Sequence, residues 1–165
     1  MNVQENDEVS IGEVPISNLL TEPLALVPAS LLMLTGDASL AEPHFKSGLA
    51  ARVAEAWTTP LPDLTGAQVR TLVGQRFGLR WLAQPVAEVL QRHPRAECDL
   101  YPGDLMCAAL RAYDDFLRFA PSEMLKVLSG DFEWMVQEFS FDSEGQLLRE
   151  AIADLQRARA AVGES

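Results

Sequence analysis

The side chains that could do chemistry in this chain are mainly carboxylates. The 165 residues include 24 Asp and Glu, but only two histidines and two cysteines. His44 and His93 each stand beside a proline, and neither has a second ligand at helical spacing, so no histidine-based metal site is expected. Cys98 and Cys107 are nine residues apart and lack the Cys-x-x-Cys spacing of zinc or redox motifs. We expect both to be buried free thiols.

Motifs for phosphate binding and nucleophilic catalysis are also missing. Gly74 and Gly78 lie in a helical pattern with no Lys-Ser/Thr after them, and no Gly-x-Ser-x-Gly sequence occurs. The pair Asp114 and Asp115 could bind a cation, but adjacent helical residues point about 100° apart, which suits a solvated face better. We therefore expect that the protein is not an enzyme and needs no cofactor. The alternative of an enzyme with unfamiliar carboxylate chemistry stays open, although no feature of the sequence favours it.

The net charge of −11 comes from 24 acidic against 13 basic residues. It argues against nucleic acid as the direct partner and favours steered association with a basic one, although solubility alone also explains an acidic protein. Residues 64–95 hold five arginines against Glu88, a net +4, whereas residues 97–145 hold eleven acids against three bases, a net −8. If the arginines do not lie near those acids, the later half presents a concentrated negative face.

Length and composition predict one globular domain. Hydrophobic residues make up 48% and charged residues 22%, which are ordinary values for a soluble protein. Residues 1–14 contain four acids and no Lys or Arg, so we expect a flexible acidic lead-in before a single helical domain at 15–165. The apolar stretch Leu19–Leu34 is interrupted by Glu22, Pro23 and Pro28 and is not a membrane span. With no signal peptide visible, a reducing, cytoplasmic location is expected.

Helical periodicity predicts an all-α fold, a compact bundle of about six helices without a confident strand. The clearest helix start is Thr65 with Gln68, the spacing of a capping box, followed by the apolar stripe Val69, Leu72, Val73 and Phe77. A second helix is expected from about Leu82 to His93, with Pro85 in its first turn.

Further helices are expected before and after this pair. One short helix follows Pro28 and ends before Gly36, and an amphipathic helix runs from Phe45 to Trp57. One helix runs from about Gly103 to Leu117, one opens at Pro121 and closes with Gly130 in a left-handed cap, and the last begins at a capping box of Ser143 and Gln146. Residues 131–141 are predicted to be helical or irregular.

Two short stretches carry a family resemblance. Leu64-Thr65, Gln68-Val69-Arg70, Leu72-Val73-Gly74-Gln75 and Gly78-Leu79, with Tyr101-Pro102-Gly103-Asp104-Leu105 further on, resemble a family of contact-dependent growth inhibition immunity proteins. The resemblance covers roughly residues 45–112. It implies a protein that neutralises the toxic C-terminal domain of a large secreted surface protein in a 1:1 complex, without direct contact to nucleic acid or membrane.

Joined to the acid excess, this resemblance suggests a nuclease as the target, with an RNase as the first candidate. Nucleases carry cationic side chains around the active site, which an acidic inhibitor can cover. The expected toxin-binding residues lie in the acidic half: Asp99, Asp104, Asp114, Asp115, Asp131, Glu133, Trp134 and Glu138. Trp134 or Phe141 could serve as aromatic anchors, although Trp134 fits the core as well. The alternative is a helical chaperone or adaptor for a secreted effector, which uses Leu19–Leu34 as a groove.

Overall fold

The computed structural model describes residues 10–22, 26–42 and 48–163. Within these ranges the protein has nine α-helices, several short 3₁₀ helices and isolated β-bridges, but no β-strand. The predicted all-α fold is confirmed, and the helices are somewhat more numerous than the six expected.

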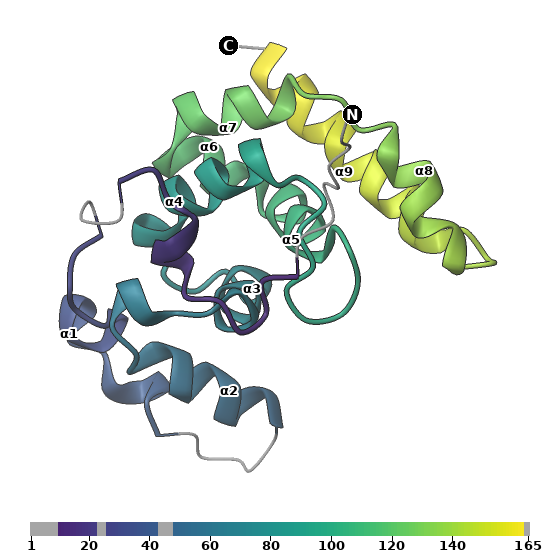
Figure 1. Ribbon diagram of the computed structural model, residues 1–165. Helices are drawn as coiled ribbons and strands as arrows, with labels where there is room; N and C mark the ends of the chain where they lie inside the picture. The colour runs from purple at the N-terminus through teal and green to yellow at the C-terminus, as the bar shows by residue number, and fades with distance from the viewer. Residues whose placement is uncertain (1–9, 23–25, 43–47, 164–165) are drawn as a thin grey trace, which may run out of the picture.

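The helices form two packed groups that meet where α3 contacts α4 and where α9 contacts α6 and α7 (Figure 1). Helix α2 packs on α3, α3 on α5 and α5 on α9, while α4 packs on α6 and α7. Their bounds are α1 Leu31–Thr35, α2 Gly48–Trp57, α3 Gly66–Gly74, α4 Leu79–Arg92, α5 Asp104–Arg111, α6 Tyr113–Phe119, α7 Pro121–Leu128, α8 Trp134–Glu138 and α9 Gln146–Gly163. The 3₁₀ helices are η1 Ile16–Leu19, η3 Ala38–Leu40, η4 Leu61–Asp63 and η5 Phe139–Phe141.

The start of α3 follows its sequence signal. The Gln68 N–H donates to Thr65 Oγ1 at 3.3 Å, and the Thr65 N–H donates to Gln68 Oε1 at 3.0 Å, which together make the predicted capping box. The stripe residues Val69, Leu72 and Val73 are buried. Helix α4 starts three residues earlier than expected, because the carbonyl of Gly78, whose φ is +73°, accepts the first helical N–H groups. Pro85 consequently lies inside α4 and not in its first turn.

Three expectations about later helix ends are wrong. The expected helix from Gly103 to Leu117 is divided into α5 and α6 at Ala112, whose ψ of 29° leaves the helical region. Gly130 does not adopt a left-handed cap, since it is absent from the positive-φ glycines among the described residues. Ser143 does not cap α9: the Asp142 carboxylate accepts the Leu147 N–H at 2.8 Å instead. Residues 131–141 are helical for the most part, as α8 and η5.

Residues 10–14 belong to the packed fold. Ile11 is 2% exposed, its N–H donates to the Glu97 carbonyl at 2.9 Å, and its own carbonyl accepts the Gly66 N–H at 3.1 Å. This part of the expected flexible lead-in is therefore a packed strap between α3 and the loop after α4, which we call the Ile11 strap. Residues 1–9 of that prediction lie outside the described residues.

A second tether holds the N-terminal segment on α4. The Thr21 N–H and hydroxyl both donate to Glu88 Oε2 at 2.7 Å, and Arg92 lies 3.8 Å from the same oxygen. Burial favours the neutral form of this partly exposed carboxyl, but the Thr21 hydrogen bonds and the Arg92 charge outweigh it and lower the pKa of Glu88.

This tether predicts a small pH-dependent contribution to stability. A carboxyl whose pKa falls on folding stabilises the fold fully above its unfolded pKa, and this stabilisation disappears as the pH falls through the folded pKa. We expect Glu88→Gln to lower the free energy of unfolding at pH 7 by up to about 1 kcal/mol, because the group is partly exposed. Urea denaturation at pH 7 and near pH 3 should show this difference at the higher pH only. Glu55→Gln, at an exposed site without an ion pair among the described residues, is the control; an equal Glu88→Gln effect at both pH values would contradict the prediction.

Candidate interaction surface

The loop between α4 and α5 is built around the Asp104 carboxylate. Its Oδ1 accepts the Cys98 N–H at 2.9 Å, and its Oδ2 accepts the N–H groups of Asp99 at 2.9 Å and Leu100 at 2.8 Å. Asp104 is 0% exposed. A toxin-binding carboxylate would have to face the solvent, and Asp104 does not, because both of its oxygens pair backbone donors of the loop. Asp104 shapes this surface from beneath and does not reach a partner.

Aromatic rings join this loop to α8 and η5. The Trp134 and Phe139 rings lie edge to face with centroids 5.8 Å apart, and Tyr101 meets Phe139 in the same way at 5.7 Å. Gly103 allows the close approach: its φ is +89°, and a Cβ there would lie 2.8 Å from the Trp134 ring. Two segments some thirty residues apart in sequence thus form one surface.

The outer end of this ring cluster is exposed. Leu100 is 60% and Phe141 is 62% exposed, and the Tyr101 ring lies 5.8 Å from that of Phe141. We call these three residues the aromatic patch. Burial raises the pKa of the Tyr101 hydroxyl, which stays neutral and protonated. Adjacent exposed aromatic and aliphatic side chains on a folded protein are typical of a binding surface.

Five of the predicted site residues lie in the two segments that form this surface. Asp99 is exposed next to Leu100, and Asp131 and Glu133 are exposed just before α8. Trp134 is half-buried among the rings, so it belongs largely to the core. Glu138 is only 11% exposed and pairs with Arg95 at 2.6 Å.

Asp114 and Asp115 lie elsewhere, at the start of α6. Arg76 contacts their carboxylates at 3.0 and 3.4 Å and also donates to the Arg111 carbonyl. Arg76 and Arg95 therefore neutralise part of the charge of the acidic half. The sequence had left open whether the arginines lie near these acids. Among the described residues, Asp99, Asp131 and Glu133 have no ion pair.

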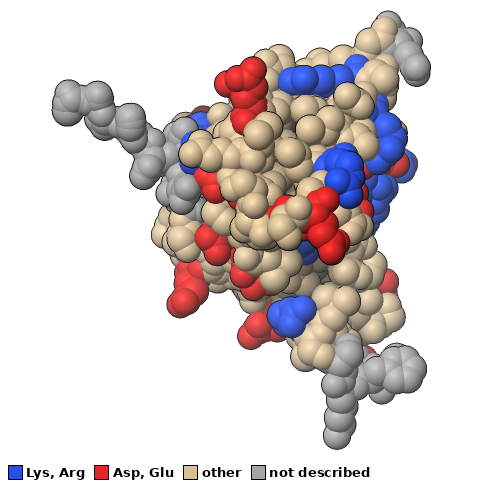
Figure 2. Space-filling view, turned by 90° about the vertical axis from the view of Figure 1, so that its right-hand side faces the viewer, with Lys and Arg blue, Asp and Glu red and all other residues tan. Residues whose placement is uncertain are grey.

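Figure 2 shows the side of the molecule that carries α8 and α9, with acidic and basic side chains interspersed between wide uncharged areas. The acids do not form one continuous sheet on this face. The sequence did not predict Leu100 or Tyr101 as binding residues, although an apolar residue in the turn beside Asp99 was an available signal. A binding role here must therefore combine apolar contacts with a few carboxylates.

The remaining candidates from the sequence are largely buried. Cys98 and Cys107 are free and buried, and burial raises the pKa of Cys107 to about 11, so this thiol is protonated and unreactive at neutral pH. In the stretch Leu19–Leu34, the side chains of Leu20, Leu26 and Leu31 lie in the core. That stretch packs on the bundle, and a pocket of about 250 Å³ lies between Leu20, Leu26 and Val27 on one side and α4 on the other.

The fold and this surface define a small all-α protein that presents an aromatic patch beside carboxylates, as a protein-binding module does. The family model of CDI immunity proteins matches residues 34–127, and the chain belongs to this family, whose members act on a cognate toxin of contact-dependent growth inhibition. No curated protein and no solved structure matches the chain. Among the described residues, no helix is both long and apolar enough to cross a lipid bilayer.

The match confirms the resemblance suggested by the motifs around Thr65 and Tyr101. It includes Leu100 and Tyr101 but ends before α8, so half of the candidate surface lies outside the matched range.

Proposed function

We propose that this immunity protein acts in the cytoplasm as a non-catalytic, cofactor-free inhibitor of one toxin domain. The toxin domain is a nuclease, with an RNase as the first candidate. The immunity protein covers its basic active site in a 1:1 complex through the aromatic patch and the neighbouring carboxylates of Asp99, Asp131 and Glu133. The observation that carries this proposal is the exposure of Leu100 and Phe141 in the two segments that also hold Asp99, Asp131 and Glu133, acids without an ion pair among the described residues.

The two kinds of side chain have different roles in the proposed complex. The net charge of −11 steers the protein toward a cationic cleft and raises the association rate. Exposed ion pairs add little affinity, so tight binding depends on apolar anchors that are desolvated at the centre of the interface. Leu100 and Phe141 are such anchors, and the Asp104 carboxylate and the Tyr101 ring hold them in position.

The test is the double variant Leu100→Ala/Phe141→Ala, measured with the cognate toxin domain. We expect its affinity for the toxin domain to fall about 100-fold, the loss of two hot-spot side chains. Titration calorimetry measures the affinity, and a nuclease assay measures inhibition. Met33→Ala and Leu125→Ala are matched controls, since both side chains are exposed and apolar on other helices. Equal losses from patch and control variants would refute this interface.

Charge-reversal variants test whether the carboxylates raise the association rate, separately from the affinity that the apolar side chains provide. We expect Asp131→Lys/Glu133→Lys to slow association at low salt, with a smaller effect at high salt. Reversal of Asp114 and Asp115 should slow it less, because Arg76 already pairs with both. If the protein bound the toxin domain only while the toxin domain was unfolded, the result would favour the alternative function, a chaperone or adaptor, over inhibition.

A further inference from the structure

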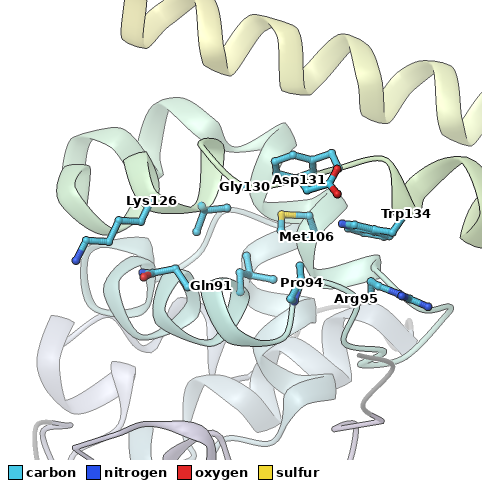
Figure 3. Close-up of a pocket in the computed structure, with 11 residues that line it drawn as sticks. Gln91, Pro94, Arg95, Met106, Lys126, Gly130, Asp131 and Trp134 are labelled. Carbon is cyan, nitrogen blue, oxygen red and sulfur yellow. The ribbon is translucent and has the colours of Figure 1, made fainter. Parts of the chain in front are cut away.

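A cleft of about 530 Å³ opens next to this surface, between the end of α4, α7 and the segment that leads into α8 (Figure 3). Its lining combines apolar side chains with polar ones: Leu90, Pro94, Met106, Val127, Phe132 and Trp134 are apolar or aromatic, and Gln91, Arg95, Lys126 and Asp131 are polar or charged. The same cleft contains Trp134, whose ring packs against Phe139 beneath the aromatic patch. The cleft therefore continues the surface proposed to bind the toxin.

The Trp134 indole N–H has no acceptor within the described part of the chain, and bulk water does not reach it. Figure 3 shows this nitrogen turned toward the cleft, with the end of Met106 beside it. A methionine side chain is unbranched and adopts new rotamers easily, so an entering group can displace it from the N–H. A buried N–H without a partner is uncommon in folded proteins, so this indole can donate a hydrogen bond to an ordered water or to an entering group.

The charges around the cleft favour a neutral occupant. Arg95 is paired with Glu138, and Figure 3 shows the Lys126 ammonium pointing away from the cleft. The Asp131 carboxylate and the Trp134 indole both belong to the lining of this cleft. One Asp131 oxygen accepts the Glu133 N–H at 2.9 Å, and the other has no donor among the described residues. The cleft thus offers one hydrogen-bond donor and one acceptor beside the apolar side chains of its lining.

We propose that the cleft receives a tyrosine side chain of the toxin domain, an inference that rests on the proposed function. The ring contacts the apolar side chains of the lining, while the hydroxyl accepts from the Trp134 N–H and donates to Asp131. A carboxylate would be repelled by Asp131, and a cation would leave the N–H without an acceptor. A phenylalanine would leave both polar groups unpaired, and a short carboxamide would leave the apolar side chains uncovered. Tyrosine satisfies the apolar side chains and both polar groups.

The chemistry of the cleft can be tested without the toxin, with p-cresol as the probe and toluene as its match without a hydroxyl. The chain has three tryptophans, and Trp134→Phe identifies the Trp134 indole signal in ¹H–¹⁵N spectra. We expect p-cresol to shift this signal downfield and to perturb the Met106 methyl signal, which Met106→Leu identifies. Toluene should perturb the methyl signal with little effect on the indole. No indole shift with p-cresol, or equal shifts with both probes, would overturn the proposal.

A second measurement places the tyrosine on the partner. We expect one Tyr→Phe variant of the toxin domain to weaken binding to the wild-type immunity protein about tenfold, and to have little effect on binding to Trp134→Phe. If the toxin binds wild type and Trp134→Phe equally well, the tyrosine inference fails while the proposed function stands. If the toxin does not bind at all, the proposed function fails, and the p-cresol result still decides the chemistry of the cleft.

Discussion

Asp104→Ala should lower the free energy of unfolding by about 3 kcal/mol or more, because one carboxylate pairs three backbone donors in a buried turn. A buried donor that loses its partner costs about 1–3 kcal/mol, and the loop can expose only part of the three to water. Urea denaturation at neutral pH measures the loss.

The control for Asp104→Ala is Asp99→Ala, which removes an exposed carboxylate from the same loop and should change stability by less than about 0.5 kcal/mol. Asp104→Asn should fall between the two, because its amide keeps one accepting oxygen but turns an NH₂ group toward a backbone donor. A change below 1 kcal/mol in Asp104→Ala would mean that water replaces the carboxylate and that the loop does not depend on it.

Gly66→Ala should be comparably harmful, for a steric reason. A Cβ at this position would lie 2.2 Å from the Ile11 carbonyl oxygen and 2.8 Å from its carbonyl carbon. Both are backbone atoms, so no rotamer change relieves the overlap, and the Ile11 strap must move away from α3. This movement breaks the bond from the Gly66 N–H to Ile11 and exposes the Ile11 side chain. We expect a loss of about 3 kcal/mol.

Gly48→Ala is the matched control for Gly66→Ala, since it also adds a methyl group in the first turn of a helix. Its Cβ would lie 3.6 Å from the end of the Arg52 side chain, an ordinary contact, so stability should stay equal or rise slightly. Limited proteolysis adds a local readout: cleavage within residues 10–20 should accelerate in Gly66→Ala and stay slow in Gly48→Ala. Equal stability and equal cleavage in both variants would show that the strap does not pack as described.

Local sequence signals predicted much of the helical arrangement. The capping box at Thr65, the helix end before Gly36 and the stop at His93 act within a single turn, so their residue types suffice. The division at Ala112 has no such signal, because its causes are packing contacts between α5, α6 and their neighbours. Ser143 has the right spacing for a cap, yet Asp142 is the residue that caps α9, since two adjacent polar side chains compete for the same helix end.

The interaction surface was harder to predict, because charge counts do not show which charges meet. Asp104 and Asp99 look alike in the sequence, but one carboxylate is enclosed by backbone donors and the other is exposed. Arg76 and Asp114 are 38 residues apart, so their ion pair follows from the fold alone. The exposure of Leu100 likewise depends on which neighbours the folded loop brings to it.

In the turn over Asp104, backbone hydrogen bonds hold the loop in its conformation, and other groups, the side chains, are exposed on its surface. The backbone N–H groups of Asp99 and Leu100 donate to the buried Asp104 carboxylate, whereas the side chains of both residues are exposed to solvent. If these two side chains contact the toxin as proposed, substitutions there would alter recognition at almost no cost in stability. New specificities could then arise by single mutations, since the fold tolerates the intermediate steps.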